Sequence, residues 1–127
     1  MFSILAGTRL ATLQAALPER NVIRLMPNLA AAIGKSPMGM FTNADLDRQR
    51  IEQLLKPLGA SFWMASEDKM DAVTALAGSG PAFVYRFIDA LAQAGSKLGL
   101  DPATSLGLAT SMVEGAALLA ADSNYSP

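Results

Sequence analysis

A serine between two glycines, followed by a proline, is the part of this sequence best suited to binding a small anion. Gly78-Ser79-Gly80-Pro81 separates two segments with helical spacing of apolar residues. The first N–H groups of a helix have no partner within it, and proline is favoured at the first helical position. With the Ser79 hydroxyl and the positive end of the helix dipole, these amides could hold a carboxylate. Glycines that relieve a kink between packed helices explain the same residues, so both interpretations stay open.

The residue types that are missing restrict the chemistry further. The chain has no histidine and no cysteine, which excludes a Ser-His-Asp triad, a thiolate nucleophile and a cysteine-ligated zinc, and we expect no metal site. Hydride transfer from a bound cofactor needs none of these groups, because the cofactor carries the reaction. The net charge is −1 and the basic residues are scattered, so we expect no binding to nucleic acid.

The elements that must position the serine fall into two halves. Up to residue 65 the pattern alternates strands, expected at 3–6, 22–26, 38–42 and 61–64, with helices that carry Leu10–Leu17 and Leu46–Leu58. This alternation is typical of an α/β sheet. We expect Thr8 to cap the first helix and Asn43 or Asp45 to cap the second. No G-x-G-x-x-G turn follows a strand, so the sheet looks incomplete and both chain ends look cut.

From residue 66 the pattern is helical throughout. Ser66 is expected to cap the first helix, Gly78-Ser79-Gly80 to break it and Pro81 to open the next, while Asp101-Pro102 starts a third. The segment 103–121 is apolar but contains several hydroxyl residues and Glu114, so we expect no membrane span. Small residues on this last helix would let another helix approach closely. No secretory signal is recognisable at the start, so we expect a cytoplasmic protein.

Three segments resemble one enzyme family. Asp71–Phe83 resembles the signature D-A-V-T-A-L-S-G-S-G-P-A-Y of the pyrroline-5-carboxylate reductases, with Ala77 in place of serine and Phe83 in place of tyrosine. Arg24–Asn28 resembles the R-V-M-P-N segment of that family, although Leu29-Ala30 follows where the family has T-P. Ala92–Leu100 resembles the family stretch A-D-A-G-V-K-A-G-L.

The resemblance implies a fold and a reaction. The fold would be α/β plus all-α, with residues 1–65 as the C-terminal part of a Rossmann-like NAD(P)-binding domain and residues 66–127 as the start of an all-helical dimerisation domain. The reaction would be the reduction of 1-pyrroline-5-carboxylate to L-proline by NADPH or NADH, in a homodimer or larger homo-oligomer. By this resemblance, the pocket that holds substrate and cofactor would be bordered by two groups of residues. The substrate would lie beside Thr74, Ser79, Gly80 and Pro81, and the nicotinamide would lie near Met26, Pro27 and Asn28. No catalytic side chain is implied.

Two alternatives share much of this description. A non-catalytic helical dimerisation module, or the remnant of an enzyme, would have the same fold. A different Rossmann dehydrogenase is less consistent with the sequence, because the glycine run follows a helix and not a strand. Since the phosphate-binding turn would precede Met1, we expect the chain alone to bind NAD(P)H weakly and to have little activity.

Overall fold

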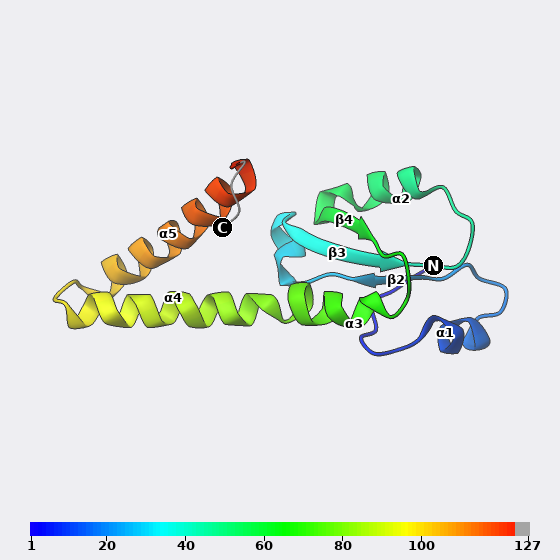
Figure 1. Cartoon of the computed structure of the whole chain (residues 1–127), viewed down its shortest axis with the longest axis horizontal. Helices are drawn as coiled ribbons and strands as arrows, with labels where there is room; N and C mark the ends of the chain where they lie inside the picture. The colour runs from blue at the N-terminus through cyan, green and yellow to red at the C-terminus, as the bar shows by residue number, and fades with distance from the viewer. Residues whose placement is uncertain (124–127) are drawn as a thin grey trace. The chain divides into compact units, whose positions relative to one another are not determined.

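The structure, a computed structural model, describes residues 1–123 and consists of two compact units. The first, Met1–Gly80, is a four-stranded sheet with helices on both faces, and the second, which begins at Pro81, contains two long helices (Figure 1). Residues 124–127, the end of the predicted helical domain, lie outside the described part. The predicted α/β plus all-α class is confirmed. The domain boundary at residues 65 and 66 stays a prediction.

The sheet contains the four predicted strands in the order β1-β2-β3-β4. These are β1 (Phe2–Ser3), β2 (Ile23–Met26), β3 (Ser36–Phe41) and β4 (Gly59–Trp63). β1 pairs in parallel with β2 and β3 in parallel with β4, whereas β2 and β3 are antiparallel. The third and fourth strands begin earlier than expected, at Ser36 and Gly59.

Alternation of side chains along the strands divides the core between the two faces. On one face, α2 (Arg48–Leu55) packs against the sheet, and the buried cluster there is Ile23, Leu25, Met38, Met40 and Leu55. On the other face, α1 (Leu10–Ala16) contributes Leu10 and Leu13 to a cluster with Val22 and Phe41. α3 (Lys69–Val73) crosses the same face so closely that a Cβ at Gly39 would lie 2.4 Å from Cγ1 of Val73.

Three predicted N-caps are wrong, because tertiary partners and neighbouring carboxylates take their place. α1 begins after Arg9, not Thr8, and its Leu10 N–H donates to Oε1 of Glu67. Asp47, not Asn43 or Asp45, caps α2 by accepting the N–H of Arg50 at 3.0 Å. Asp68, not Ser66, is the residue before α3, and its side chain pairs with Arg9 at 2.8 Å.

Two 3-10 helices lead into strands; the first was not predicted, whereas the second lies within the helix expected to end at Leu58. η1 (Leu29–Ile33) follows Asn28, and η2 (Lys56–Leu58) continues α2 up to Gly59. Gly59 has a φ of 140°, and a Cβ there would lie 2.1 Å from the carbonyl oxygen of Ser36. Only glycine therefore allows β4 to begin beside the start of β3.

The second unit contains α5 (Pro102–Asp122) and all of α4 (Gly80–Lys97) except its first residue, Gly80. As predicted, Asp101 caps α5, since it accepts the N–H of Thr104 at 3.0 Å, and Pro102 occupies the first turn. The two helices touch where Gly95 faces Ser105, since a Cβ at Gly95 would lie 2.8 Å from Oγ of Ser105.

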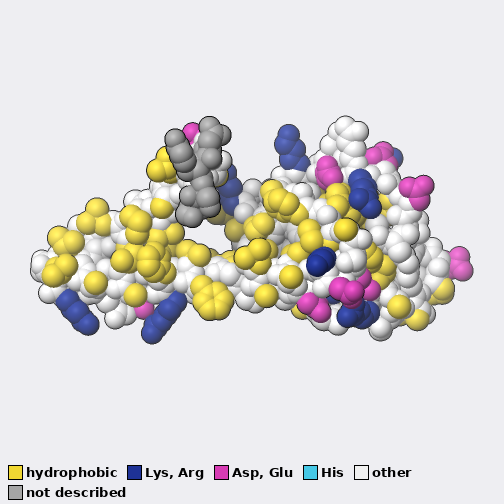
Figure 2. All heavy atoms as spheres, viewed as in Figure 1, with side chains coloured by type: hydrophobic (Ala, Val, Ile, Leu, Met, Phe, Trp, Pro, Cys, Tyr) yellow, Lys and Arg dark blue, Asp and Glu magenta, His cyan; other side chains and the backbone are white. Residues whose placement is uncertain are grey.

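Much of the apolar surface of the second unit is exposed, and Figure 2 shows hydrophobic side chains along both helices. By length and composition alone α5 could cross a membrane, since its most apolar window has a mean hydropathy of 1.3, and 11% of that window is buried inside the chain. The exposed large side chains include Phe83, Tyr85, Phe87, Leu106, Leu108, Met112, Leu118 and Leu119.

Candidate functional site

The predicted break at Gly78-Ser79-Gly80 is a π-helical turn followed by a bend. The π-helical segment η3 (Thr74–Gly78) continues directly from α3, and the Ser79 N–H donates to the Thr74 carbonyl at 2.9 Å. α4 then begins at Gly80. A π turn inserts an extra residue into a helix, and such turns are frequent at functional sites.

The predicted substrate residues are distributed along this turn. Thr74 is half-buried and its hydroxyl donates to the carbonyl of Met70 at 2.9 Å, the helical back-bonding that threonine commonly makes. Ser79 is exposed, and its hydroxyl makes no hydrogen bond to any of residues 1–123. Gly80 is the first residue of α4, and Pro81 follows it as the first residue of the second unit.

The predicted cofactor residues form the corner between β2 and η1. Met26 is buried at the end of β2, and Pro27 and Asn28 are half-buried. Asn28 caps η1, since its Oδ1 accepts the N–H of Ala30 at 2.9 Å. Its own N–H donates to Oγ of Ser36 at 2.9 Å.

The corner and the π turn are in contact. Nδ2 of Asn28 donates to the carbonyl of Ala77 at 2.9 Å. A Cβ at Gly78 would lie 3.8 Å from Sδ of Met26, which is ordinary van der Waals contact. The structure therefore brings together the two segments that sequence reasoning treated separately, although their roles toward substrate and cofactor stay predictions.

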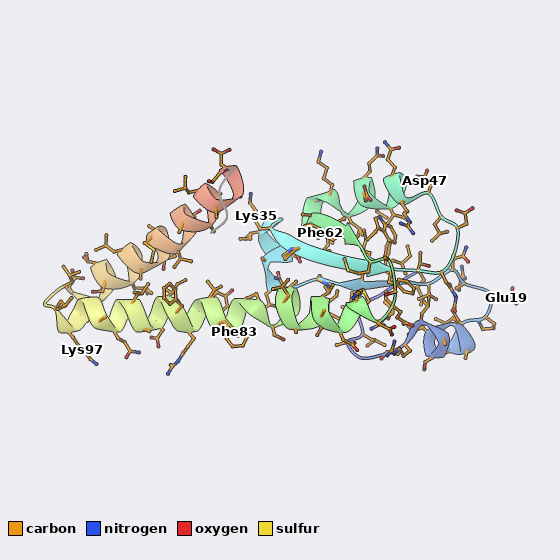
Figure 3. All side chains as sticks on the ribbon, in the orientation of Figure 1. Glu19, Lys35, Asp47, Phe62, Phe83 and Lys97 are labelled. Carbon is orange, nitrogen blue, oxygen red and sulfur yellow. The ribbon has the colours of Figure 1, made fainter. Side chains whose placement is uncertain are left out.

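An apolar cavity of about 480 Å³ lies between the β3–β4 face of the sheet and the helical run from α3 to η3. Its walls include Phe62 on β4 (Figure 3), Val73, Leu76 and Ala77, and Lys69 is the charged residue among them. Its walls are otherwise apolar and are suited to excluding water. This cavity was not predicted from the sequence. The one sequence feature that could have indicated it is Gly39, because a glycine inside a strand often marks the close approach of another element.

Two ion pairs join the start of the chain to the segment that leads into α3. Arg24 on β2 is 3% exposed, and its Nη1 lies 2.8 Å from Oε1 of Glu67. Nε of Arg24 is buried without a partner among residues 1–123. Nearby, the hydrogen bond to Asp68 raises the pKa of the exposed Arg9. In the described part of the chain, no group of three or more Asp, Glu, His or Cys side chains is arranged to hold a metal ion.

Comparison with known proteins gives consistent results along the chain. Residues 67–127 match the family described as pyrroline-5-carboxylate reductase dimerisation. A pyrroline-5-carboxylate reductase of Pseudomonas aeruginosa is 39% identical over 129 residues, which cover 98% of this chain and 47% of that protein. Pyrroline-5-carboxylate reductase 2 of Bacillus subtilis is 38% identical, and the match covers 100% of this chain and 47% of that protein.

Solved structures agree in fold. The 1-pyrroline-5-carboxylate reductase of Streptococcus pyogenes has a TM-score of 0.89 at 36% identity, covering 99% of this chain and 50% of that one. The Plasmodium falciparum pyrroline carboxylate reductase, solved with NADP bound, has a TM-score of 0.89 at 26% identity over 99% of this chain and 52% of that one. The resemblance recognised in the sequence is confirmed, and the chain spans about half the length of these relatives.

Proposed function

We propose that this chain, a relative of the pyrroline-5-carboxylate reductases along its whole length, forms part of an enzyme that reduces 1-pyrroline-5-carboxylate to L-proline with NADPH or NADH. The observation that carries the proposal is the contact between the β2–η1 corner and the π turn, made by Asn28 and Ala77. Both of these residues belong to the first unit, so the contact links the proposed cofactor segment to the turn that carries Ser79.

On the substrate side, Ser79 would bind the carboxylate of the ring. Its hydroxyl is exposed and makes no hydrogen bond within residues 1–123, so it is free to donate to an anion. Gly80 and Pro81 would border the same position at the start of α4, and Thr74 would line the pocket beside them. Because Oγ1 of Thr74 donates its proton to Met70, it could only accept a hydrogen bond from the ligand.

On the cofactor side, Met26, Pro27 and Asn28 would lie near the nicotinamide. The NADP bound to the Plasmodium falciparum relative supports a dinucleotide as the cofactor. The cofactor, when bound, supplies the hydride that reduces the C=N carbon. This chain would orient the substrate and exclude water, and the apolar cavity beside Ala77 is suited to the second task.

No strong acid is required from the protein in this reaction. The iminium form of the substrate already carries a proton on its ring nitrogen, so hydride addition to the carbon completes the neutral amine. The absence of histidine is compatible with such a mechanism. The absence of cysteine is compatible with a cytoplasmic location, which we include in the proposal.

A second copy of the chain would cover the helices of the second unit. The match to a dimerisation family starts at residue 67 and includes both α4 and α5. Their exposed side chains, such as Leu119 at 70% exposure, need an apolar partner. We therefore assign the apolar surface of α5 to a homo-oligomer rather than to a membrane.

A non-catalytic dimerisation module is the second candidate. The family match that it would require lies within residues 67–127, and no G-x-G-x-x-G turn occurs in the chain. A non-catalytic module would form the same oligomer, but Ser79 would have no role in it.

A chimera separates the two candidates. This chain would replace the matching segment of the Pseudomonas aeruginosa relative, and NADPH oxidation with 1-pyrroline-5-carboxylate would be followed by absorbance. We expect activity within about tenfold of the parent enzyme, and Ser79→Ala to lower kcat/KM at least about tenfold through the lost hydrogen bond to a charged group. A folded, assembled chimera without activity, or with activity unaffected by Ser79→Ala, would contradict the proposal.

A further inference from the structure

Pro81 leaves the carbonyl of Ala77 without its usual helical partner. Ala77 lies near the end of the π turn, just before α4 resumes α-helical bonding between residues four positions apart. In that α-helical pattern its carbonyl would accept the N–H of Pro81, and proline has no N–H. A carbonyl that is removed from water without a donor costs free energy. The structure supplies the donor from another element, because Nδ2 of Asn28 lies 2.9 Å from this oxygen.

The remaining polar groups of Asn28 hold the side chain in this orientation. Oδ1 accepts the N–H of Ala30 at 2.9 Å, and the backbone N–H donates to Oγ of Ser36 at 2.9 Å. Ser36 is fully buried, so it anchors the backbone of Asn28 to β3. Ala30 provides a donor and Ala77 provides an acceptor, and this difference determines which end of the amide faces each of them.

Capping of η1 alone does not explain an asparagine at this position. Aspartate caps helices as well as asparagine does, because both supply the acceptor oxygen. Only asparagine also supplies a donor on the same side chain. The bond to Ala77 is therefore the feature that distinguishes Asn28 from an aspartate at residue 28.

We infer that Asn28 is a positioning residue that replaces the N–H missing at Pro81 and so holds the π turn, and with it Ser79, against the β2–η1 corner. The structural part of this inference stands on its own. The part that concerns catalysis rests on the proposed function, in which the corner meets the cofactor and Ser79 meets the substrate. A displacement of about 1 Å between reacting groups can lower a rate about a hundredfold.

Hydrogen exchange in the 127-residue chain tests the structural part. Asn28→Asp keeps the acceptor for Ala30 but removes the donor to Ala77, and Asn28→Ala removes both. We expect both variants to speed exchange of the Ser79 N–H about tenfold, and only Asn28→Ala to speed exchange at Ala30. Asn43→Ala, which removes an exposed asparagine that pairs with Gln14, is the control and should change neither amide.

A second substitution provides a rescue. Pro81→Ala restores an N–H that is able to donate to the carbonyl of Ala77, so it should slow exchange at Ser79 again when combined with Asn28→Asp. Exchange of the β3 amides reports whether the variants keep the fold. Unchanged exchange at Ser79 in a folded Asn28→Asp variant would overturn the inference.

Kinetics of the chimera test the catalytic part. We expect Asn28→Asp to lower kcat about a hundredfold, and Ser79→Ala to add little once Asn28→Asp is present, because both act on the same hydroxyl. If Asn28 had only a structural role, its substitution would lower the amount of folded enzyme, and the effects of the two substitutions on the activation free energy would add. Additive effects, or an unchanged kcat, would overturn the positioning role. If the parent chimera is inactive, the proposed function fails, while the exchange experiment still decides whether Asn28 holds the turn.

Discussion

Nη1 of Arg24 and Oε1 of Glu67 lie 2.8 Å apart and connect the buried strand β2 to the segment that leads into α3. The same carboxylate oxygen accepts the N–H of Leu10 at the start of α1. One side chain therefore connects a strand and two helices on the face of the sheet that carries the π turn. A cation as deeply buried as Arg24 depends on this partner, because it has little contact with water.

Removal of the negative charge at Glu67 should be strongly destabilising. Glu67→Gln leaves the guanidinium of Arg24, which is 3% exposed, without a counter-charge. We expect the free energy of unfolding to fall by about 2 kcal/mol, measured by urea denaturation. Asp68→Asn is the matched control, because it removes an exposed ion pair and should leave the urea midpoint nearly unchanged. Equal losses in both variants would show that the burial of Arg24 is unimportant.

A side chain at Gly39 should force α3 away from the sheet. The Cβ of Gly39→Ala would lie 2.4 Å from Cγ1 and 2.9 Å from Cγ2 of Val73. We expect a loss of about 2 kcal/mol from overpacking, measured by urea denaturation. Combined with Val73→Ala, the same substitution should cost clearly less than the sum of the two single variants, since the two clashing Cγ atoms are removed and only Cβ of residue 73 remains close, at 3.1 Å. Strictly additive losses would argue against this contact.

A charge on the apolar surface of α5 should prevent self-association. Leu108 is 57% exposed in the single chain, and a second copy would bury it. We expect Leu108→Glu to convert a dimer or larger assembly to a monomer in sedimentation velocity, because an unpaired carboxylate would be removed from water at the interface. Lys97→Glu introduces the same side chain near the end of α4 and should preserve the assembly. A monomeric parent chain at micromolar concentration would contradict the proposed homo-oligomer.

The capping of α5 should weaken in acid. Hydrogen bonding to the Thr104 side chain, and then to its backbone N–H, lowers the pKa of Asp101. Since the folded-state pKa lies below the unfolded one, the ionised carboxylate stabilises α5 above a pH of about 4, and this contribution is lost as the pH falls through the lowered value.

The chemical shift of the Thr104 N–H reports this titration directly. We expect its midpoint below a pH of about 3.9, the ordinary value for aspartate. In Asp101→Asn the amide should show no such titration while the cap persists. A midpoint at or above the ordinary value would mean that the hydrogen bond in the structure does not stabilise the charged form.

Local sequence rules succeeded for several elements whose determining residues are neighbours, although the local cap of α2, Asp47, was missed. The four strands, the start of α5 at Asp101-Pro102 and the break at Gly78-Ser79-Gly80 were predicted from short segments. The same rules failed at Thr8 and Ser66. The carboxylates of Glu67 and Asp68 act on Leu10 and Arg9, far away in the chain, and no local pattern contains this information.

The sequence by itself determined the family resemblance, the change from alternating elements to continuous helices, and the set of residues proposed for the pocket. Each of these depends on residue types at short spacing. Only the tertiary structure decided that β2 and β3 are antiparallel, that α3 packs onto Gly39, and that Asn28 faces Ala77 across 49 residues of chain. The physical reason is that a missing N–H at Pro81 can be seen in the sequence, whereas the donor that replaces it comes from an element brought there by the packing of the sheet.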